Sequence, residues 1–308
     1  MELKFKSLLQ FAQHFNCESK CSEYLAQMRW GDKPICPHCN HDDKIYKFKN
    51  GIHYKCSSCN KRFTVRVGAA LEDSRVSLQK WLIAFYLTTS HKKGISSIQL
   101  SKDIGVTQKT AWYMLQRIQY IANADIELYE GTVEIDEVYV GGKESNKHPS
   151  RKTMNYNKIQ GDKAPILGIY NVENKTIRYT YFDKVNKANI LPIIEKNVSP
   201  NAIIHTDESL VYKSLKKDRV HYVVNHKNRE FARNGVTTNR IEGSFAHFKR
   251  SINGIYHWVS HKHIQKYANM FSFRWNTKYL DEIERINLFI SKMNNTKLTY
   301  RALINDQR

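Results

Sequence analysis

Four cysteines in the first fifth of the chain constrain its fold more than any other feature. They form two Cys-X-X-Cys pairs, Cys36 with Cys39 and Cys56 with Cys59, separated by sixteen residues. Each pair can present two thiolates to one tetrahedral ion, and the segment between them is long enough for a hairpin that brings the pairs together. Because four thiolates leave no coordination position for water or substrate, we expect a structural zinc ion.

Strand patterns surround these cysteines. Residues 45–48 and 53–56 flank an Asn-Gly turn, and residues 62–67 form a third candidate strand. A unit this small has little apolar core, so zinc would hold it together, as in a zinc ribbon. Two disulfides or buried free thiols are the alternatives, and a cytoplasmic location disfavours the first. We interpret the remaining cysteines, Cys17 and Cys21, as packed thiols.

Helical spacing follows the ribbon. Residues 96–105 predict a short helix that ends at a glycine, and Thr107 can cap a second helix. This is the outline of a helix-turn-helix, whose second helix would offer Lys109 and Arg117 to DNA. A helix pair packed in a core or a linker is the alternative interpretation.

The charge of the chain favours an anionic partner. Lys and Arg number 49 against 29 Asp and Glu, a formal net charge of +20 that nucleic acid would neutralise. No run of residues approaches the ~20 apolar residues that cross a bilayer, and the first residues lack a secretory apolar core. We therefore expect a cytoplasmic protein that binds DNA and no membrane.

From residue 132 the pattern predicts an α/β domain. Strands are expected at 132–141, 164–170, 176–182, 202–206 and 219–224, and helices at 186–196, at 238–251 and over most of 261–292. The first three strands suggest an antiparallel meander. The order of elements is that of an RNase H-like domain with a mixed five-stranded sheet.

Three carboxylates of this domain could converge at one edge of the sheet. Asp136 lies on the first strand, Asp207 follows the fourth, and Glu242 lies on a later helix. Divalent cations such as Mg²⁺ or Mn²⁺ prefer oxygen ligands, and two of them can promote an in-line phosphoryl displacement. The set therefore predicts a catalytic metal site.

Each carboxylate also has a structural explanation. Asp207 could cap the helix after it, with Glu208 as its rival for a ligand role. Glu242 follows Asn239 by three residues and could complete a capping box. Asp136 is the best placed, because a charge inside an apolar strand is costly unless it is paired or bound to metal.

Longer motifs carry a resemblance to a known family. They are Val133-Glu-Ile-Asp136-Glu, Gly141-Gly-Lys143, His205-Thr-Asp207, Thr238-Asn-Arg-Ile-Glu242 with its continuation to Arg250, and the stretch from Gly254 to Tyr267. Together with the ribbon they resemble DDE transposases of bacterial insertion sequences of the ISXO type. Lys249 lies seven residues after Glu242, on the same helix face, as in that family.

The resemblance implies DNA cleavage at the terminal repeats of an element, followed by strand transfer into target DNA. It implies Asp136, Asp207 and Glu242 as the Mg²⁺ or Mn²⁺ ligands, with Lys249 and Asn239 holding the terminal strand. Because two element ends must be joined together, we expect a homo-oligomer. Two other functions stay open: a DNA-binding regulator with an inert α/β domain, and an RNase H-like nuclease that cuts without joining.

Clusters of basic residues agree with a DNA substrate. Lys143 opens a stretch to residue 163 with six basic and two acidic residues, and Arg250 lies in the basic helical end. The expected domains are an N-terminal helical segment (1–30), the zinc ribbon (31–70), the helix-turn-helix-like segment (71–128), the RNase H-like catalytic domain (129–255) and a C-terminal helical extension (256–308).

Overall fold

The chain forms two compact units in the computed structural model, which describes residues 5–123, 127–142, 148, 150, 163–228, 230 and 232–305. Unit 1 combines residues 1–123 with 277–308, and unit 2 is residues 124–276. The expected extension 256–308 is thus shared between the units, because its last part packs with the N-terminal helices. None of the described helices is both long and apolar enough to cross a membrane.

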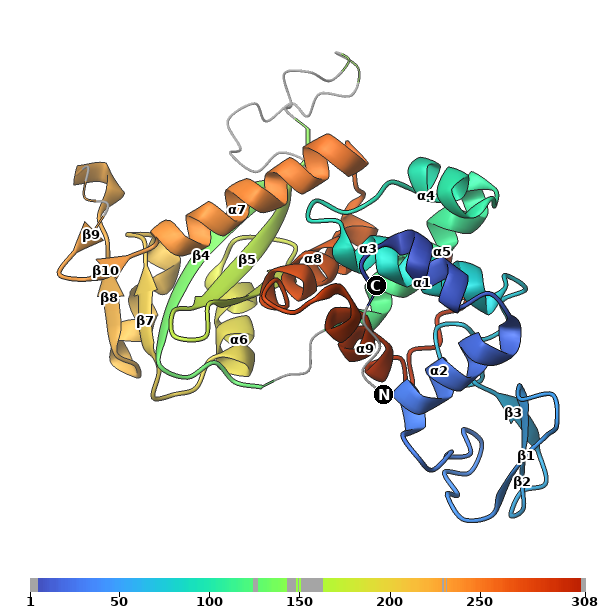
Figure 1. Cartoon of the computed structure of the whole chain (residues 1–308). Helices are drawn as coiled ribbons and strands as arrows, with labels where there is room; N and C mark the ends of the chain where they lie inside the picture. The colour runs from blue at the N-terminus through green and yellow to red at the C-terminus, as the bar shows by residue number, and fades with distance from the viewer. Residues whose placement is uncertain are drawn as a thin grey trace. The chain divides into compact units, whose positions relative to one another are not determined.

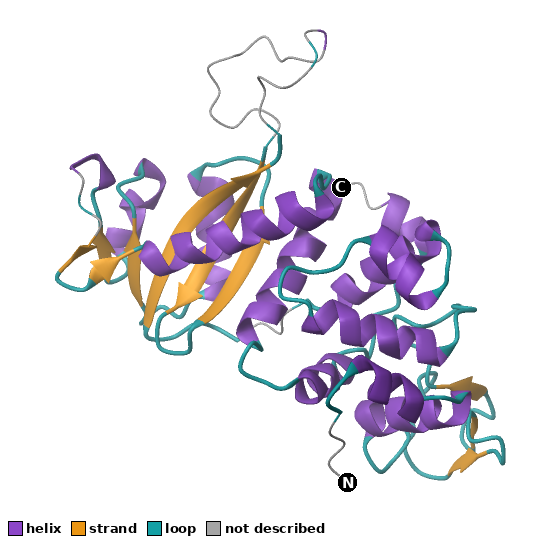
Figure 2. Ribbon diagram, turned by 45° about the horizontal axis from the view of Figure 1, so that its top comes forward, coloured by secondary structure: helices purple, strands orange, loops and turns teal. Residues whose placement is uncertain are grey.

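Unit 1 contains a small sheet and a group of helices (Figure 2). Its elements are α1 (Leu8–His14), α2 (Glu18–Trp30), β1 (Ile45–Lys47), β2 (His53–Cys56), β3 (Arg62–Thr64), α3 (Leu78–Ser90), α4 (Ser97–Ile104), α5 (Gln108–Ile121), α9 (Glu282–Ser291) and α10 (Tyr300–Asn305). The strands pair antiparallel in the order β1-β2-β3, which confirms the predicted hairpin and third strand.

The predicted helix pair is present as α4 and α5. Ser96 and Thr107 accept hydrogen bonds from backbone N–H groups of the helices that they precede, and Gly105 ends α4 with a φ of 60°. A positive φ is easy only for a residue without a Cβ, so the glycine fixes the turn. The C-terminal helix α9 packs against the N-terminal helices of unit 1. Its Phe289 lies against Phe85 of α3, with the ring centroids 5.5 Å apart.

Unit 2 is built on a mixed five-stranded sheet in the order β6-β5-β4-β7-β8. Its elements are β4 (Thr132–Val140), β5 (Ala164–Asn171), β6 (Thr176–Tyr181), α6 (Lys187–Asn197), β7 (Ile203–Thr206), η3 (Leu210–Lys217), β8 (His221–Val223), η4 (His226–Asn228), β9 (Ala232–Arg233), β10 (Val236–Thr237), α7 (Asn239–Ser251), η5 (Ile252–Tyr256) and α8 (His261–Asn276). The strands β6, β5 and β4 pair antiparallel, while β4, β7 and β8 pair parallel. The predicted α/β fold with its mixed sheet is confirmed.

Helices cover both faces of this sheet. Helices α7 and α8 pack on one face through a core that includes Val138 and Phe245, and α6 with η3 packs on the other through a core that includes Ile135 and Tyr212. Figure 1 shows α7 lying along β4 and β5. Because side chains alternate along a strand, Asp136 is on the same face of β4 as Val138 and is directed toward α7.

Candidate functional site

Asp136 lies in the middle of the central strand. Its Oδ1 accepts a hydrogen bond from the backbone N–H of Glu137 at 2.7 Å. Burial and the neighbouring charge of Glu137 raise the pKa of Asp136 well above its usual value, and the charges of Asp207 and Glu242 raise it further. The three predicted carboxylates are therefore near enough to interact, although they are far apart in sequence.

Asp207 follows β7, the parallel neighbour of β4. Its Oδ1 accepts the Ser209 N–H at 3.0 Å, and burial, followed by the charge of Glu208, raises the pKa of its carboxyl. Glu208 has different partners, because its Oε2 accepts the backbone N–H of His226 at 3.0 Å. Asp207 does not cap the following helix η3, whose N-cap is Ser209 with no side-chain cap hydrogen bond, and its charge acts on Asp136.

Glu242 lies in the first turn of α7. Its Oε1 accepts a hydrogen bond from the Thr238 hydroxyl at 2.9 Å and lies 3.3 Å from His226 Nε2. The capping box considered for Asn239 and Glu242 does not form, because Thr238 is the N-cap and Asn239 is already the first helical residue. Glu242 is thus not occupied in capping α7.

Two cavities flank these carboxylates. One of about 320 Å³ is lined by Asp136, Glu137, Val138, Tyr139, Glu242, Phe245, Ala246 and Lys249. The other, also of about 320 Å³, is lined by Asp207, Glu208, Ser209, Lys213, Lys216, His221 and Val223. The first therefore brings together two predicted metal ligands and the predicted catalytic lysine.

The carboxylates suit a divalent cation by their chemistry. The charges of Asp207 and Glu242 raise the pKa of Asp136, and a bound cation would stabilise all three groups as anions. The carboxylates are nevertheless spread out. Among the described residues, only the four cysteines form a group whose potential ligand atoms all lie within 4.8 Å of one another.

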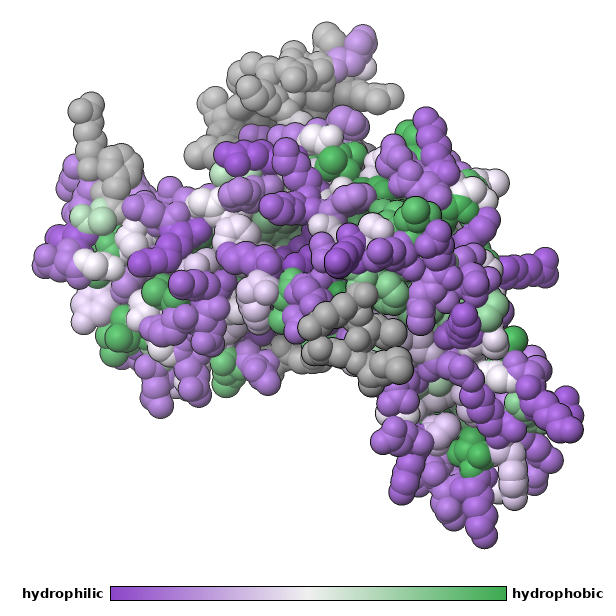
Figure 3. Space-filling view, in the orientation of Figure 1, coloured by the Kyte–Doolittle hydropathy of each residue, from purple (hydrophilic) through white to green (hydrophobic). Residues whose placement is uncertain are grey.

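Several predicted DNA contacts are on the outside of α7. Asn239, Lys249 and Arg250 are exposed, and Figure 3 shows hydrophilic residues along this helix. Lys143 lies outside the described residues. Lys249 thus both lines the cavity that contains Asp136 and is exposed on α7, next to Arg250 in the chain.

The two basic residues predicted on α5 have different surroundings. Lys109 is exposed in the first turn. Arg117 is only 5% exposed, and its guanidinium donates to the Glu72 carbonyl at 3.0 Å and to the Tyr113 hydroxyl at 2.9 Å. This packing assigns Arg117 to the core of unit 1, so we leave it out of the proposed DNA surface.

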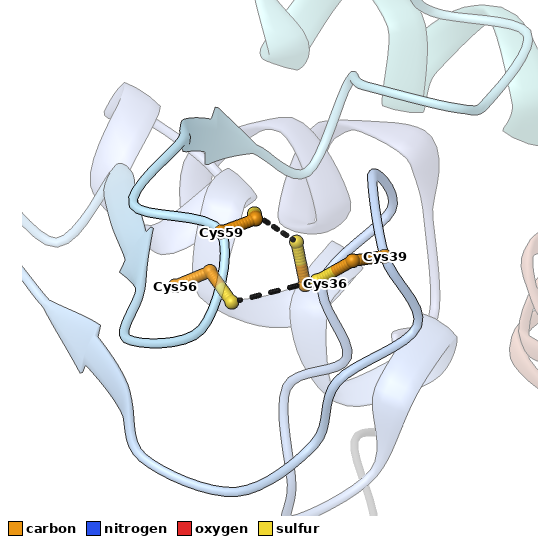
Figure 4. A group of neighbouring side chains, drawn as sticks. All are labelled: Cys36, Cys39, Cys56 and Cys59. Atoms are coloured by element: carbon orange, nitrogen blue, oxygen red, sulfur yellow. Dashed lines mark hydrogen bonds between the residues drawn. The ribbon is translucent and has the colours of Figure 1, made fainter.

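The four predicted zinc ligands converge in unit 1. The Sγ atoms of Cys36 and Cys59 are 3.7 Å apart, as are those of Cys39 and Cys56 (Figure 4). A tetrahedral ion with Zn–S bonds of about 2.3 Å would separate its sulfurs by about 3.8 Å. The cysteine cluster therefore fits a structural zinc ion.

The two cysteine turns have the same backbone geometry. The N–H of Cys36 donates to the His41 carbonyl, and the N–H of Cys56 donates to the Lys61 carbonyl. Each turn then has an asparagine directly after its second cysteine, and both asparagines have a φ of 58°. A repeated turn with asparagine in this conformation aims both thiol pairs at one point.

Two important residues of unit 2 were not predicted. Glu134 is completely buried and binds the start of α7, and Gly168 lies opposite Asp136 in the β4–β5 pairing. A signal for Glu134 was present, because it lies two positions before Asp136 and so on the same strand face. Gly168 carried the weaker signal of a glycine inside an apolar strand.

The α/β domain and the cysteine-containing segment each match a known protein family. Residues 129–276 match the ISXO2-like transposase domain, and residues 16–62 match a transposase zinc-ribbon domain. The chain is also 28% identical over 273 residues to an uncharacterized protein in transposable element ISH50 of Halobacterium salinarum, covering 84% of this chain and 91% of that protein. The matches fall on the segments whose motifs suggested the resemblance.

Proposed function

Because the chain carries an ISXO2-like transposase domain and a transposase zinc ribbon, we propose that it cleaves DNA at the ends of an insertion element and joins those ends to target DNA. Cleavage is attack by water on a phosphodiester, which frees a 3′-hydroxyl. Joining is attack by that hydroxyl on a phosphodiester of the target. Both steps are in-line phosphoryl transfers, so one site can serve both.

One observation supports this proposal above all. A single cavity is lined by Asp136, Glu242 and Lys249, and the charge of Asp207 acts on Asp136 from the neighbouring strand. Anionic oxygens and an ammonium group around one cavity can hold cations and a phosphate side by side. A regulator with an inert domain has no need of this combination.

We assign Asp136, Asp207 and Glu242 as ligands for two Mg²⁺ or Mn²⁺ ions, which would supply charge stabilisation at the attacking and leaving oxygens. Thr238 and His226 orient the Glu242 carboxylate by the contacts described above. Lys249 would hold the scissile phosphate as a point charge, and Asn239 and Arg250 would contact the strand outside the cavity.

Unit 1 would recognise the element ends. The ribbon, held by zinc, and the exposed first turn of α5 with Lys109 are its candidate DNA contacts, because a recognition helix reads bases with its N-terminal residues. Two ends must be joined in one reaction, so we propose that the protein acts as a homo-oligomer on DNA.

The test compares wild-type protein with Asp207→Asn and with the matched control Glu208→Gln. Each is incubated with Mg²⁺ or Mn²⁺, a DNA fragment bearing the flanks of its own gene, and a supercoiled target plasmid. We expect joined products from the wild type and the control and none from Asp207→Asn, because a neutral amide lacks the negative charge with which a carboxylate holds a divalent cation.

Other results would point to other functions. Cutting without joining would favour the RNase H-like nuclease. Specific binding without cutting by any variant would favour the regulator, and equal loss in Glu208→Gln would overturn the assignment of Asp207 over its neighbour.

A further inference from the structure

A buried carboxylate holds the start of α7 on the central strand. From this contact we propose that Glu134 is a positioning residue of the metal site, which fixes the place of Glu242 relative to Asp136. The inference rests on the proposed function, since it concerns the same carboxylates.

The contacts of Glu134 are numerous for a single side chain. It is 0% exposed. Its Oε2 accepts the backbone N–H groups of Arg240 at 2.9 Å and Ile241 at 3.0 Å, and its Oε1 accepts the Arg240 guanidinium at 2.7 Å. Both carboxylate oxygens are therefore directed at the first turn of α7, 106 residues later in the chain.

The first turn of α7 depends on this carboxylate. Thr238, the N-cap, makes no side-chain hydrogen bond to the helix N–H groups. The N–H of Asn239 donates to Thr237 Oγ1, and that of Glu242 donates to the Thr238 carbonyl, each at 3.1 Å. The two N–H groups between them have Glu134 as their acceptor, and a negative charge at a helix N-terminus is favourable.

The hydrogen bonds of Glu134 to Arg240 and Ile241, called the clamp below, set one position for α7 on the sheet. If α7 moved along β4, Glu134 would become a buried charge without partners, which is strongly unfavourable. Asp136 is two residues from Glu134 on the same strand, and Glu242 is the next residue after Ile241. The clamp therefore ties two proposed metal ligands from distant segments to one another.

Glu134 is fully buried, and both of its oxygens accept N–H donors of α7. Its proposed role is therefore to place other metal ligands rather than to bind the metal itself. Residues that orient metal ligands typically change metal affinity by about 10- to 100-fold when they are replaced.

The experiment measures Mn²⁺ binding by the electron paramagnetic resonance signal of free Mn²⁺, with zinc-loaded full-length protein and no DNA. Glu134→Gln keeps the size of the side chain but replaces an acceptor oxygen with a donor. We expect at least a tenfold weaker Mn²⁺ affinity, and partial recovery of DNA cleavage at high Mn²⁺.

The matched control is Glu173→Gln. Glu173 also accepts a backbone N–H bond in unit 2, from Thr132 at 2.9 and 3.0 Å, but none of its hydrogen bonds is to α7. A loss of stability alone would lower the melting temperature of both variants. Only the positioning role predicts a changed Mn²⁺ affinity at a temperature where all proteins are folded.

The outcomes separate this inference from the proposed function. If the wild type binds Mn²⁺, Asp136→Asn does not, and folded Glu134→Gln binds like the wild type, the positioning role is wrong while the metal site stands. If wild type and Asp136→Asn bind Mn²⁺ equally, the proposed metal site fails. If Glu134→Gln does not fold, Arg240→Gln decides: a two- to threefold loss of affinity supports the clamp, and an unchanged affinity rejects it.

Discussion

Gly168 lies directly opposite Asp136 in the pairing of β5 with β4, and a side chain at this position would collide with α7. A Cβ at this position would lie 2.5 Å from Phe245 Cε1 and 2.7 Å from Ile241 Cδ1, both on α7. A close approach of helix and strand therefore exists at the level of the first proposed metal ligand.

We predict that Gly168→Ala destabilises the protein by about 1 to 3 kcal/mol, because the extra methyl group overpacks a closed core. The displaced α7 carries Glu242, so cleavage should fall as well. Urea unfolding and the cleavage assay measure the two effects.

The control for this change is Gly243→Ala, within α7 itself. An added Cβ there meets nothing within 4 Å. Alanine should stabilise the helix by roughly 0.5 to 1 kcal/mol at such a position. Equal effects of the two substitutions would contradict the close approach at Gly168.

The cysteine cluster leads to a prediction about zinc content. Cys36→Ser should abolish the bound zinc and unfold the ribbon, because this small sheet lacks a large core of its own. Cys17 is exposed and lies outside the cluster, so Cys17→Ser should retain full zinc. Metal analysis of both purified proteins checks this, and full zinc in Cys36→Ser would refute the assignment.

The sequence was sufficient for much of unit 2. Alternating apolar residues marked the strands, and acidic residues inside or directly after two of them marked Asp136 and Asp207 as proposed metal ligands. The sequence was not sufficient for the clamp, because Arg240, the first partner of Glu134 on α7, is 106 residues away in the chain. Long-range contacts of this kind have no local signal.

The helical part of unit 1 shows the opposite limitation. Arg117 was expected to be exposed to DNA, yet it is buried in the structure, together with its polar neighbours Gln116 and Gln119. Tertiary partners such as the Glu72 carbonyl explain Arg117. The return of α9 to the N-terminal helices was likewise not evident from local patterns.

The different surroundings of Lys109 and Arg117 predict opposite effects of substitution. Lys109→Ala should weaken DNA binding and lower the slope of its salt dependence by about 1, with unchanged stability. Arg117→Ala should destabilise unit 1 by about 1 to 3 kcal/mol, since it removes buried hydrogen bonds. Fluorescence anisotropy and thermal unfolding measure these effects, and an exchange of the two results would reject our placement of the DNA surface.

His221 on β8 predicts a dependence of stability on pH. Burial, with the nearby charges of Lys216 and His205, lowers the pKa of His221 from 6.5 to about 4. Between these values the unfolded chain binds the proton more readily than the folded one, so stability falls as pH falls from 6.5 toward 4. After allowance for solvent screening, we expect this contribution to be about 1 to 2 kcal/mol. Urea unfolding at several pH values should show a shallower fall for His221→Gln than for the wild type, and parallel curves would show that His221 is not the group responsible.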